Sequence, residues 1–103
     1  MDEAKASEIA KRNDAFRRSG QMHVTRGARA LGDLQGLLRA VKQFDRFTED
    51  NDPYGEHDFG SLNWRGQTVF WKVDYYDQSM QRWEDPLSPK CQRVLTVMHA
   101  SEY

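Results

Sequence analysis

The sequence is poor in the features that would assign it to a special environment. It has one cysteine, Cys91, so an internal disulfide is excluded. No apolar run approaches the roughly 18 residues that a membrane-spanning helix needs. The first residues also lack the basic and then apolar order of a signal peptide. We therefore expect a cytoplasmic protein that makes no contact with a membrane.

The composition is that of a folded domain. Hydrophobic side chains make up 38% of the 103 residues and charged ones 30%, and the aromatic residues suffice for one core. We expect a single domain over residues 1–103. The net charge of −1 is unevenly distributed, because residues 1–46 hold more basic than acidic side chains and residues 47–103 hold the reverse. This asymmetry either steers a charged partner or separates two solvated surfaces by chance.

Two segments have the periodicity of amphipathic helices. The first spans residues 3–19, with Ile9 and Phe16 as its apolar anchors. The second spans residues 33–47 and carries a stripe of apolar residues at helical spacing: Leu34, Leu37, Leu38, Val41 and Phe44. We expect the basic side chains of the first helix to face solvent: Lys5, Lys11, Arg12, Arg17 and Arg18.

Strands are predicted where β-branched and aromatic residues gather, over residues 21–26, 57–64, 67–76 and 92–100. Gly27 and Gly32 bracket a predicted turn. The pattern predicts an α+β fold with two helices packed on one face of a roughly four-stranded antiparallel sheet, in the order α-β-α-β-β-β. The predicted core comprises Ile9, Phe16, Val24, Leu34, Leu38, Val41, Phe44, Val69, Trp71, Val73, Leu95 and Val97. Trp83 is expected to cover this core.

The Arg65-Gly66 pair predicts a two-residue hairpin loop between the strands at 57–64 and 67–76. The register then places Gly60 opposite Trp71, where the missing side chain leaves room for the indole ring. It also places His57 opposite Asp74, within reach of a hydrogen bond or an ion pair. A type I turn with a bulge would instead shift the pairing by one residue.

The acidic turn, Thr48–Gly60, is the most distinctive stretch of the chain. Its carboxylates suggest a divalent cation site made of Asp50, Asp52, Glu56 and Asp58. A calcium loop needs ligand oxygens where Tyr54 and Ser61 stand, whereas a Mg²⁺ site needs only one or two carboxylates. The alternative is a structured turn without a metal, in which Asp50 or Asn51 binds backbone N–H groups and Gly55 has a positive φ. We favour the structured turn and expect no cofactor.

An enzyme would need a base and a nucleophile. His57 with Asp74 or Asp58 could supply a base and the carboxylate that orients it. No nucleophile accompanies them, because neither Ser61 nor Cys91 lies in a nucleophile motif. We favour a non-enzymatic protein and keep a metal-assisted or acid–base hydrolase that uses residues 49–58 as the alternative. Direct nucleic-acid binding is less favoured, because the net charge is near zero and no nucleic-acid motif is present.

Several stretches resemble a known family in their order along the chain. They are Thr25-Arg26-Gly27, the motif DNDPYGEHDFG at residues 50–60, residues 70–77, residues 93–98 and the end Ser101-Glu102-Tyr103. From about residue 8 onward the chain resembles a family of small bacterial proteins known only as a domain of unknown function. The resemblance implies no catalytic residue. Since such proteins are typical of the accessory genes of plasmids and phages, it implies a modulator of some target, such as a phage-type inhibitor of a CRISPR-type bacterial defence complex.

The sequence thus predicts a small non-enzymatic interaction protein. Its contact surface is expected to be the acidic turn with the end of the 67–76 strand: Asp50, Asp52, Tyr54, Glu56, His57, Asp58, Asp74, Tyr76 and Asp77. Tyrosines and charges on an ordered loop are typical of protein contacts. The expected partner is another protein or a nucleoprotein complex.

Overall fold

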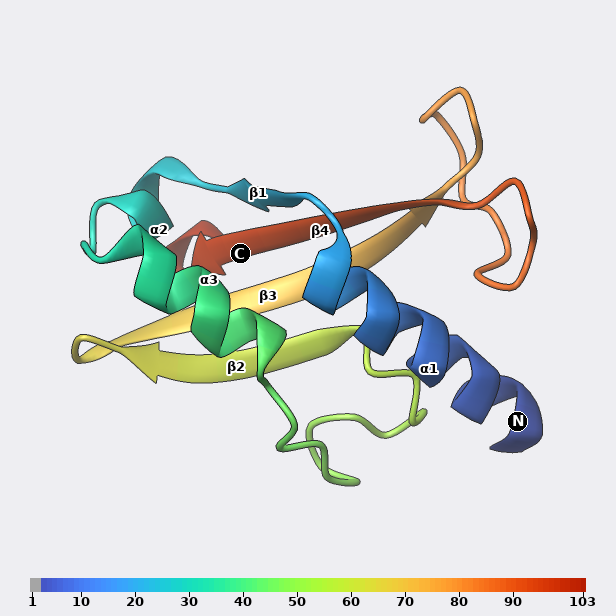
Figure 1. The fold of residues 1–103 in the computed structure, drawn as a ribbon, viewed down its shortest axis with the longest axis horizontal. Helices are drawn as coiled ribbons and strands as arrows, with labels where there is room; N and C mark the ends of the chain where they lie inside the picture. Colours follow the sequence, from blue (N-terminus) through green and yellow to red (C-terminus); the bar gives the residue numbers. More distant parts are fainter. Residues whose placement is uncertain (1–2) are drawn as a thin grey trace.

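The computed structural model describes residues 3–103, which form helices and one sheet. The helices are α1 (Glu3–Ser19), α2 (Arg26–Arg29), α3 (Leu34–Lys42) and the 3₁₀ helix η1 (Ala100–Glu102). The strands are β1 (Met22–Val24), β2 (Phe59–Trp64), β3 (Gln67–Tyr76) and β4 (Gln92–His99). Figure 1 shows α1 and α3 together over one face of the sheet. This is the predicted α+β class. Within the described residues, no helix combines the length and the apolar character needed to cross a membrane.

The sheet is mixed, so the prediction of a purely antiparallel sheet was wrong. The strand order is β1-β4-β3-β2, with β2 and β4 antiparallel to β3 and with β1 parallel to β4. The chain leaves α1 and continues into β1 in the direction in which β4 also runs (Figure 1). Alternating side chains define the two faces of a strand but not its direction, so the sequence pattern did not reveal the parallel pair.

A short helix, α2, stands where a turn between Gly27 and Gly32 was predicted, so the predicted order of elements was incomplete. Thr25 caps this helix, because its hydroxyl oxygen accepts a hydrogen bond from the N–H of Ala28 at 3.4 Å. The Glu102 carboxylate accepts hydrogen bonds from the Thr25 hydroxyl at 2.6 Å and from the Gly27 N–H at 3.0 Å. These bonds attach the C-terminal 3₁₀ helix to α2.

The hairpin between β2 and β3 has the predicted register. Gly60 pairs with Trp71, and a Cβ atom added at Gly60 would collide with the indole ring. Arg65 and Gly66 both have a positive φ, of 54° and 83°, as a two-residue type I′ loop requires. The strand does not reach His57, however, because β2 begins two residues later.

The α3 helix ends at Lys42, earlier than the predicted residue 47. Arg17 of α1 donates from Nε to the Val41 carbonyl at 3.0 Å and from a terminal nitrogen to the Phe44 carbonyl at 2.9 Å. The last carbonyl groups of a helix lack intrahelical donors, so the guanidinium caps α3. Only 1% of Arg17 is exposed, which corrects the prediction that this side chain faces solvent.

The core lies between the helices and the sheet. Among the predicted core residues, the fully buried ones are Ile9, Val41, Val69, Trp71, Val73, Leu95 and Val97. The remaining predicted residues are partly buried at its margin: Phe16, Val24, Leu34, Leu38 and Phe44. Leu37 occupies the innermost position of α3. Trp83 is 69% exposed, so the prediction that it covers the core was wrong.

We expect Arg17→Met to lower the free energy of unfolding by about 3 kcal/mol. The variant keeps a long apolar side chain but removes the guanidinium donors to the Val41 and Phe44 carbonyl groups. Urea unfolding followed by circular dichroism measures the change. The matched control is Arg18→Met, which removes the same charge at an exposed neighbouring position and should cost less than about 0.5 kcal/mol. Equal stability of the two variants would contradict the capping role.

Candidate binding site

The acidic turn is held in a fixed shape by its own side chains. The Asn51 carboxamide accepts a hydrogen bond from a backbone N–H at 2.8 Å and donates one to a backbone carbonyl at 2.7 Å. Both carboxylate oxygens of Asp52 lie 3.3 Å from the N–H of His57. Gly55 has a φ of +69°. These are the features of the structured turn that we favoured, with Asn51 rather than Asp50 bound to the backbone.

His57 connects this turn to α1. Its Nδ1 lies 3.0 Å from the Asp14 carboxylate on α1, and its Nε2 lies 3.7 Å from the Asp52 carboxylate. The imidazole also stacks on Phe47, with the ring centroids 3.7 Å apart and the planes nearly parallel. The predicted pairing of His57 with Asp74 was therefore wrong. A φ of +55° at His57 takes the chain out of the strand conformation before β2 begins.

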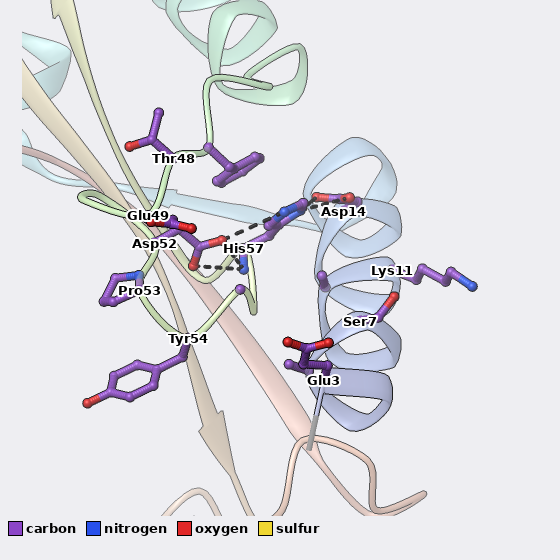
Figure 2. A pocket seen from close by; sticks show the side chains of 14 residues that line it. Glu3, Ser7, Lys11, Asp14, Thr48, Glu49, Asp52, Pro53, Tyr54 and His57 are labelled. Atoms are coloured by element: carbon purple, nitrogen blue, oxygen red, sulfur yellow. Dashed lines mark hydrogen bonds and ion pairs between the residues drawn. The ribbon is translucent and has the colours of Figure 1, made fainter. Parts of the chain in front are cut away.

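A groove of about 690 Å³, which we call the α1 groove, lies between α1 and the acidic turn (Figure 2). Glu3, Ser7 and Lys11 line it on the α1 side, and Asp52 and Tyr54 line it on the turn side. The Tyr54 side chain points away from α1 in Figure 2 and is 66% exposed. The groove therefore has charges of both signs and an aromatic ring at its edge.

Asn13 holds the turn at a second point. Its buried carboxamide nitrogen donates to the Glu56 carbonyl at 2.9 Å and to the Tyr75 hydroxyl at 2.7 Å. Its oxygen accepts a hydrogen bond from Nε of Arg93 at 2.7 Å. Two consecutive residues of α1, Asn13 and Asp14, thus fix the turn against the helix. Satisfied buried polar groups of this kind give a contact a single geometry.

A second hollow, of about 490 Å³, lies on another face of α1. It is lined by Lys5, Ile9, Glu56, Asp58, Tyr75, Trp83, Asp85 and Pro86, and we call it the Trp83 hollow. Trp83 belongs to the loop between β3 and β4, where a backbone bridge pairs it with Tyr76. Arg93 anchors the same loop by donating to the Pro86 carbonyl at 2.8 Å. The exposed indole is therefore positioned by the sheet.

Two carboxyl groups of the Trp83 hollow, those of Glu56 and Asp58, have raised pKa values. Burial raises the pKa of Asp58, and the charge of Asp52 adds to the effect. Burial and the charge of Asp58 likewise raise the pKa of Glu56, an effect that Lys5 opposes. Burial also raises the pKa of the Tyr75 hydroxyl. The ionised carboxylates are thus less stable in this hollow than in water, and a cation brought to them would stabilise them.

The residues predicted to form one surface are distributed over adjoining places. Asp52, Tyr54 and His57 line the α1 groove, and Glu56 and Asp58 line the Trp83 hollow. A further depression of about 290 Å³ brings Asp58 and Trp83 together with Asp74 and Tyr76. Each of these three hollows includes at least one residue of the turn 52–58, so the turn connects them on the candidate surface.

The other predicted residues have separate roles. Asp74 forms an ion pair with Lys72 at 3.0 Å on the neighbouring part of β3. Asp77 accepts hydrogen bonds from the Ser79 hydroxyl at 2.7 Å and from backbone N–H groups of its own loop. Asp50 is exposed and does not line the α1 groove or the Trp83 hollow. Across residues 3–103, no three His, Cys, Asp or Glu side chains are grouped so as to hold a metal ion.

The site has part of an acid–base arrangement. The contact between His57 and Asp14 has the geometry of a base and its orienting carboxylate. Nε2 of His57 faces Asp52, however, and the hydrogen bonds of the ring among the described residues run to Asp14 rather than to a hydroxyl or thiol. Burial raises the pKa of the Cys91 thiol, which disfavours its nucleophilic form. The arrangement is better suited to holding charged groups than to nucleophilic catalysis.

Comparison with known proteins gives one match. Residues 24–102 match the family described as "Protein of unknown function (DUF3768)". The chain belongs to this family. No curated protein and no solved structure matches it. The part that matches DUF3768 includes the acidic turn and Trp83, whereas the Asn13 and Asp14 contacts come from α1, which precedes it.

Sequence reasoning missed the residues that position the turn. Asn13 carried a signal, because a polar residue on the apolar face of a helix often makes a specific buried hydrogen bond. Asp14 and Phe47 carried none, since their partner His57 is far away in the sequence. Trp83 was expected to cover the core because large aromatic residues are usually buried.

We expect Asp58→Asn to raise the free energy of unfolding at pH 7. Because the pKa of Asp58 is raised, the folded wild-type protein binds this proton more tightly than the unfolded chain does. Its stability therefore falls as the pH rises from about 4 toward neutrality. The amide has no proton to lose, so the advantage of the variant should grow over that pH range. Urea unfolding at several pH values measures it.

Asp77→Asn is the matched control, and its effect should have the opposite sign. The hydrogen bond from the Ser79 hydroxyl lowers the pKa of Asp77. The stabilisation that this ionised group provides is present above its ordinary pKa and is lost as the pH falls through the lowered value. If Asp58→Asn loses stability with the same pH dependence as Asp77→Asn, the pKa of Asp58 is not raised in the folded protein and the prediction is contradicted.

Proposed function

We propose that the protein is a small non-enzymatic interaction protein that binds basic side chains of another protein at the Trp83 hollow. The observation that carries this proposal is that Glu56 and Asp58, both with raised pKa values, meet beside the exposed Trp83 in one hollow. A solvated turn of no further role would be expected to spread its carboxylates into water. Here Asn13 of α1 bonds to the Glu56 carbonyl and Val73 of β3 bonds to the Asp58 carbonyl, which keeps the two residues beside the hollow.

The types of side chain in the hollow match a cationic ligand. The face of an indole attracts ammonium and guanidinium groups, and the attraction increases when water is excluded. Carboxylates form short, charge-assisted hydrogen bonds with the same groups. An arginine of a partner would stack on Trp83 and donate to Glu56 or Asp58. Tryptophan and tyrosine are also the residues on which protein interfaces most often depend.

The raised pKa values explain why binding would be favourable. Burial is the larger cause of the raised pKa values, and repulsion among Asp52, Glu56 and Asp58 adds to it. A positive charge near a carboxyl group lowers its pKa, so a bound guanidinium would oppose that repulsion. Lys5 lines the hollow and lowers the pKa of Glu56, but burial and the charges of Asp58 and Asp52 outweigh this effect. A partner would therefore add positive charge beyond that of Lys5.

The partner is accordingly another protein or a nucleoprotein complex with exposed basic side chains. A narrower proposal is that the chain inhibits a CRISPR-type bacterial defence complex. The family resemblance of the DNDPYGEHDFG motif supports it, as does the chemistry of the hollow. Nucleoprotein complexes bind phosphate through lysine and arginine, and an acidic surface would compete for those side chains.

A metal-assisted or acid–base hydrolase is the alternative, and one observation favours it. A carboxyl group with a raised pKa is the usual form of a general acid, and Glu56 and Asp58 are such groups. Calorimetric titration with Mg²⁺, Mn²⁺ and Ca²⁺ separates the metal-assisted form from the interaction protein. Tight binding that disappears in Asp52→Ala and Asp58→Ala would favour the hydrolase.

We expect a hexa-arginine peptide to bind the protein and to shift the indole N–H resonance of Trp83 in an NMR titration. Trp83→Ala and Asp58→Asn should each weaken binding by about 1 kcal/mol, because each removes one contact with a guanidinium group. Binding should also weaken as the pH falls toward the raised pKa values of Glu56 and Asp58, since protonated carboxyl groups no longer attract a cation.

Glu8→Gln is the matched control, because it removes one negative charge from an exposed position of α1 outside the hollow. It should leave the affinity for hexa-arginine nearly unchanged. If Glu8→Gln weakens binding as much as Asp58→Asn does, the peptide responds to net charge and the Trp83 hollow is not the site. Absence of any shift of the Trp83 resonance would have the same meaning.

A further inference from the structure

The strand β2 has one side that no part of the described chain pairs with. It is an outermost strand of the sheet, next to β3 only (Figure 1). The N–H of Val73 in β3 donates to the Asp58 carbonyl at 2.8 Å. Along an antiparallel strand every second residue bonds to the same neighbour, so Gly60 and Leu62 also direct their backbone groups toward β3. The backbone N–H and C=O groups of Phe59, Ser61 and Asn63 consequently point outward.

This edge lacks the features that normally prevent strands from pairing between molecules. Its sequence, Phe59-Gly-Ser-Leu-Asn-Trp64, contains no charged residue and no proline, and its pairing with β3 is regular throughout. The other edge of the sheet is different, because β1 has only three residues. Ser61 and Asn63 are exposed, so an approaching strand could reach their backbone groups.

We propose that β2 pairs with β2 of a second copy of this chain, in antiparallel orientation across a two-fold axis at Ser61. In this register Leu62 of one copy would lie opposite Gly60 of the other, whose open face is filled by the Trp71 indole of its own copy. Phe59 would lie opposite Asn63, and no like charges would face each other. The two sheets would form one continuous sheet of both copies.

The surroundings of β2 favour a second copy as the occupant. A hollow of about 320 Å³ runs beside the strand, between residues 40–46 and residues 61–64. Asp45 and Arg46 line it, both are exposed, and neither has an ion-pair partner within residues 3–103. A two-fold axis relates the Asp45 and Arg46 of one copy to those of the other, so that the acidic residue of each copy would face the basic residue of its partner.

The dimer is expected to be reversible. A junction of two six-residue strands lies at or below the roughly 1,200 Å² that a stable interface buries, so it would form and dissociate with concentration. Analytical ultracentrifugation of the full chain, from low to high micromolar concentration, should show a shift from the 12.1 kDa monomer to twice that mass. A monomer at every concentration would overturn the proposal.

Two variants locate the contact. Ser61→Pro removes an outward N–H that makes no bond within the chain, and edge strands tolerate proline at such positions. Ser61→Lys places two like charges opposite each other at the two-fold axis. Both should remain folded by circular dichroism and should lose the dimer. Thr68→Lys is the matched control, because it adds the same charge at an exposed position of β3, and it should dimerise like the wild type.

Hydrogen exchange distinguishes this contact from any other mode of association. The amides of Phe59, Ser61 and Asn63 should be protected at high protein concentration and should exchange freely at low concentration. Those of Gly60 and Leu62 should be protected at both, because they bond to β3. A dimer in which the three outward amides exchange freely, or which survives Ser61→Lys, would use another surface and overturn the proposal. Protection that appears only with an added partner protein would likewise assign the edge to that partner.

Discussion

The buried guanidinium of Arg17 is the contact on which the position of the candidate site depends. It bonds to the carbonyl groups of Val41 in α3 and of Phe44 just after α3. It also forms an ion pair with Asp14 at 3.1 Å and lies over the Trp71 ring at 4.8 Å. A buried charge is stable only where every donor finds an acceptor, so these contacts define one orientation of α1 against α3 and the sheet. Asp14 is then held where His57 meets it. The acidic turn is consequently placed by a charge network that begins in the core.

The same need for partners explains why Glu56 and Asp58 of the Trp83 hollow keep raised pKa values although Lys5 also lines it. Two arginines of the surrounding elements make contacts that serve the fold. Arg93 bonds to Asn13 and to the Pro86 carbonyl, and Arg12 bonds to Glu8 and to the Leu87 carbonyl. Burial and mutual repulsion then raise the pKa values of Glu56 and Asp58, which is a cost in stability at neutral pH. Destabilising groups that the rest of a structure holds together are typical of functional sites.

The sequence predicted the parts of the fold that depend on interactions between residues close to one another along the chain. The hairpin followed from the Arg65-Gly66 loop and from the fit of Gly60 to Trp71, both of which involve neighbouring strands. The boundaries of α1 followed from its periodicity and its charged ends. The burial of Arg17 could not be predicted, because its acceptors, Val41 and Phe44, are far from it in the sequence. The candidate site also depends on contacts between residues that are distant in the sequence, since the helix, the turn and the β3–β4 loop meet there only in the folded protein.

The shape of the acidic turn and its orientation on the protein are set by different parts of the chain. Asn51, Asp52 and Gly55 give the turn its shape through local bonds, and all three lie within the part of the chain that matches the DUF3768 family. Asn13 and Asp14 give it an orientation, and they lie outside that part. A loop that is ordered before it meets a ligand loses little conformational entropy on binding, so little of the binding free energy of its charges and rings is offset. In the proposed recognition the helix would contribute by immobilising the turn. The residues that would contact a partner in the Trp83 hollow come mainly from the turn and from the loop that carries Trp83.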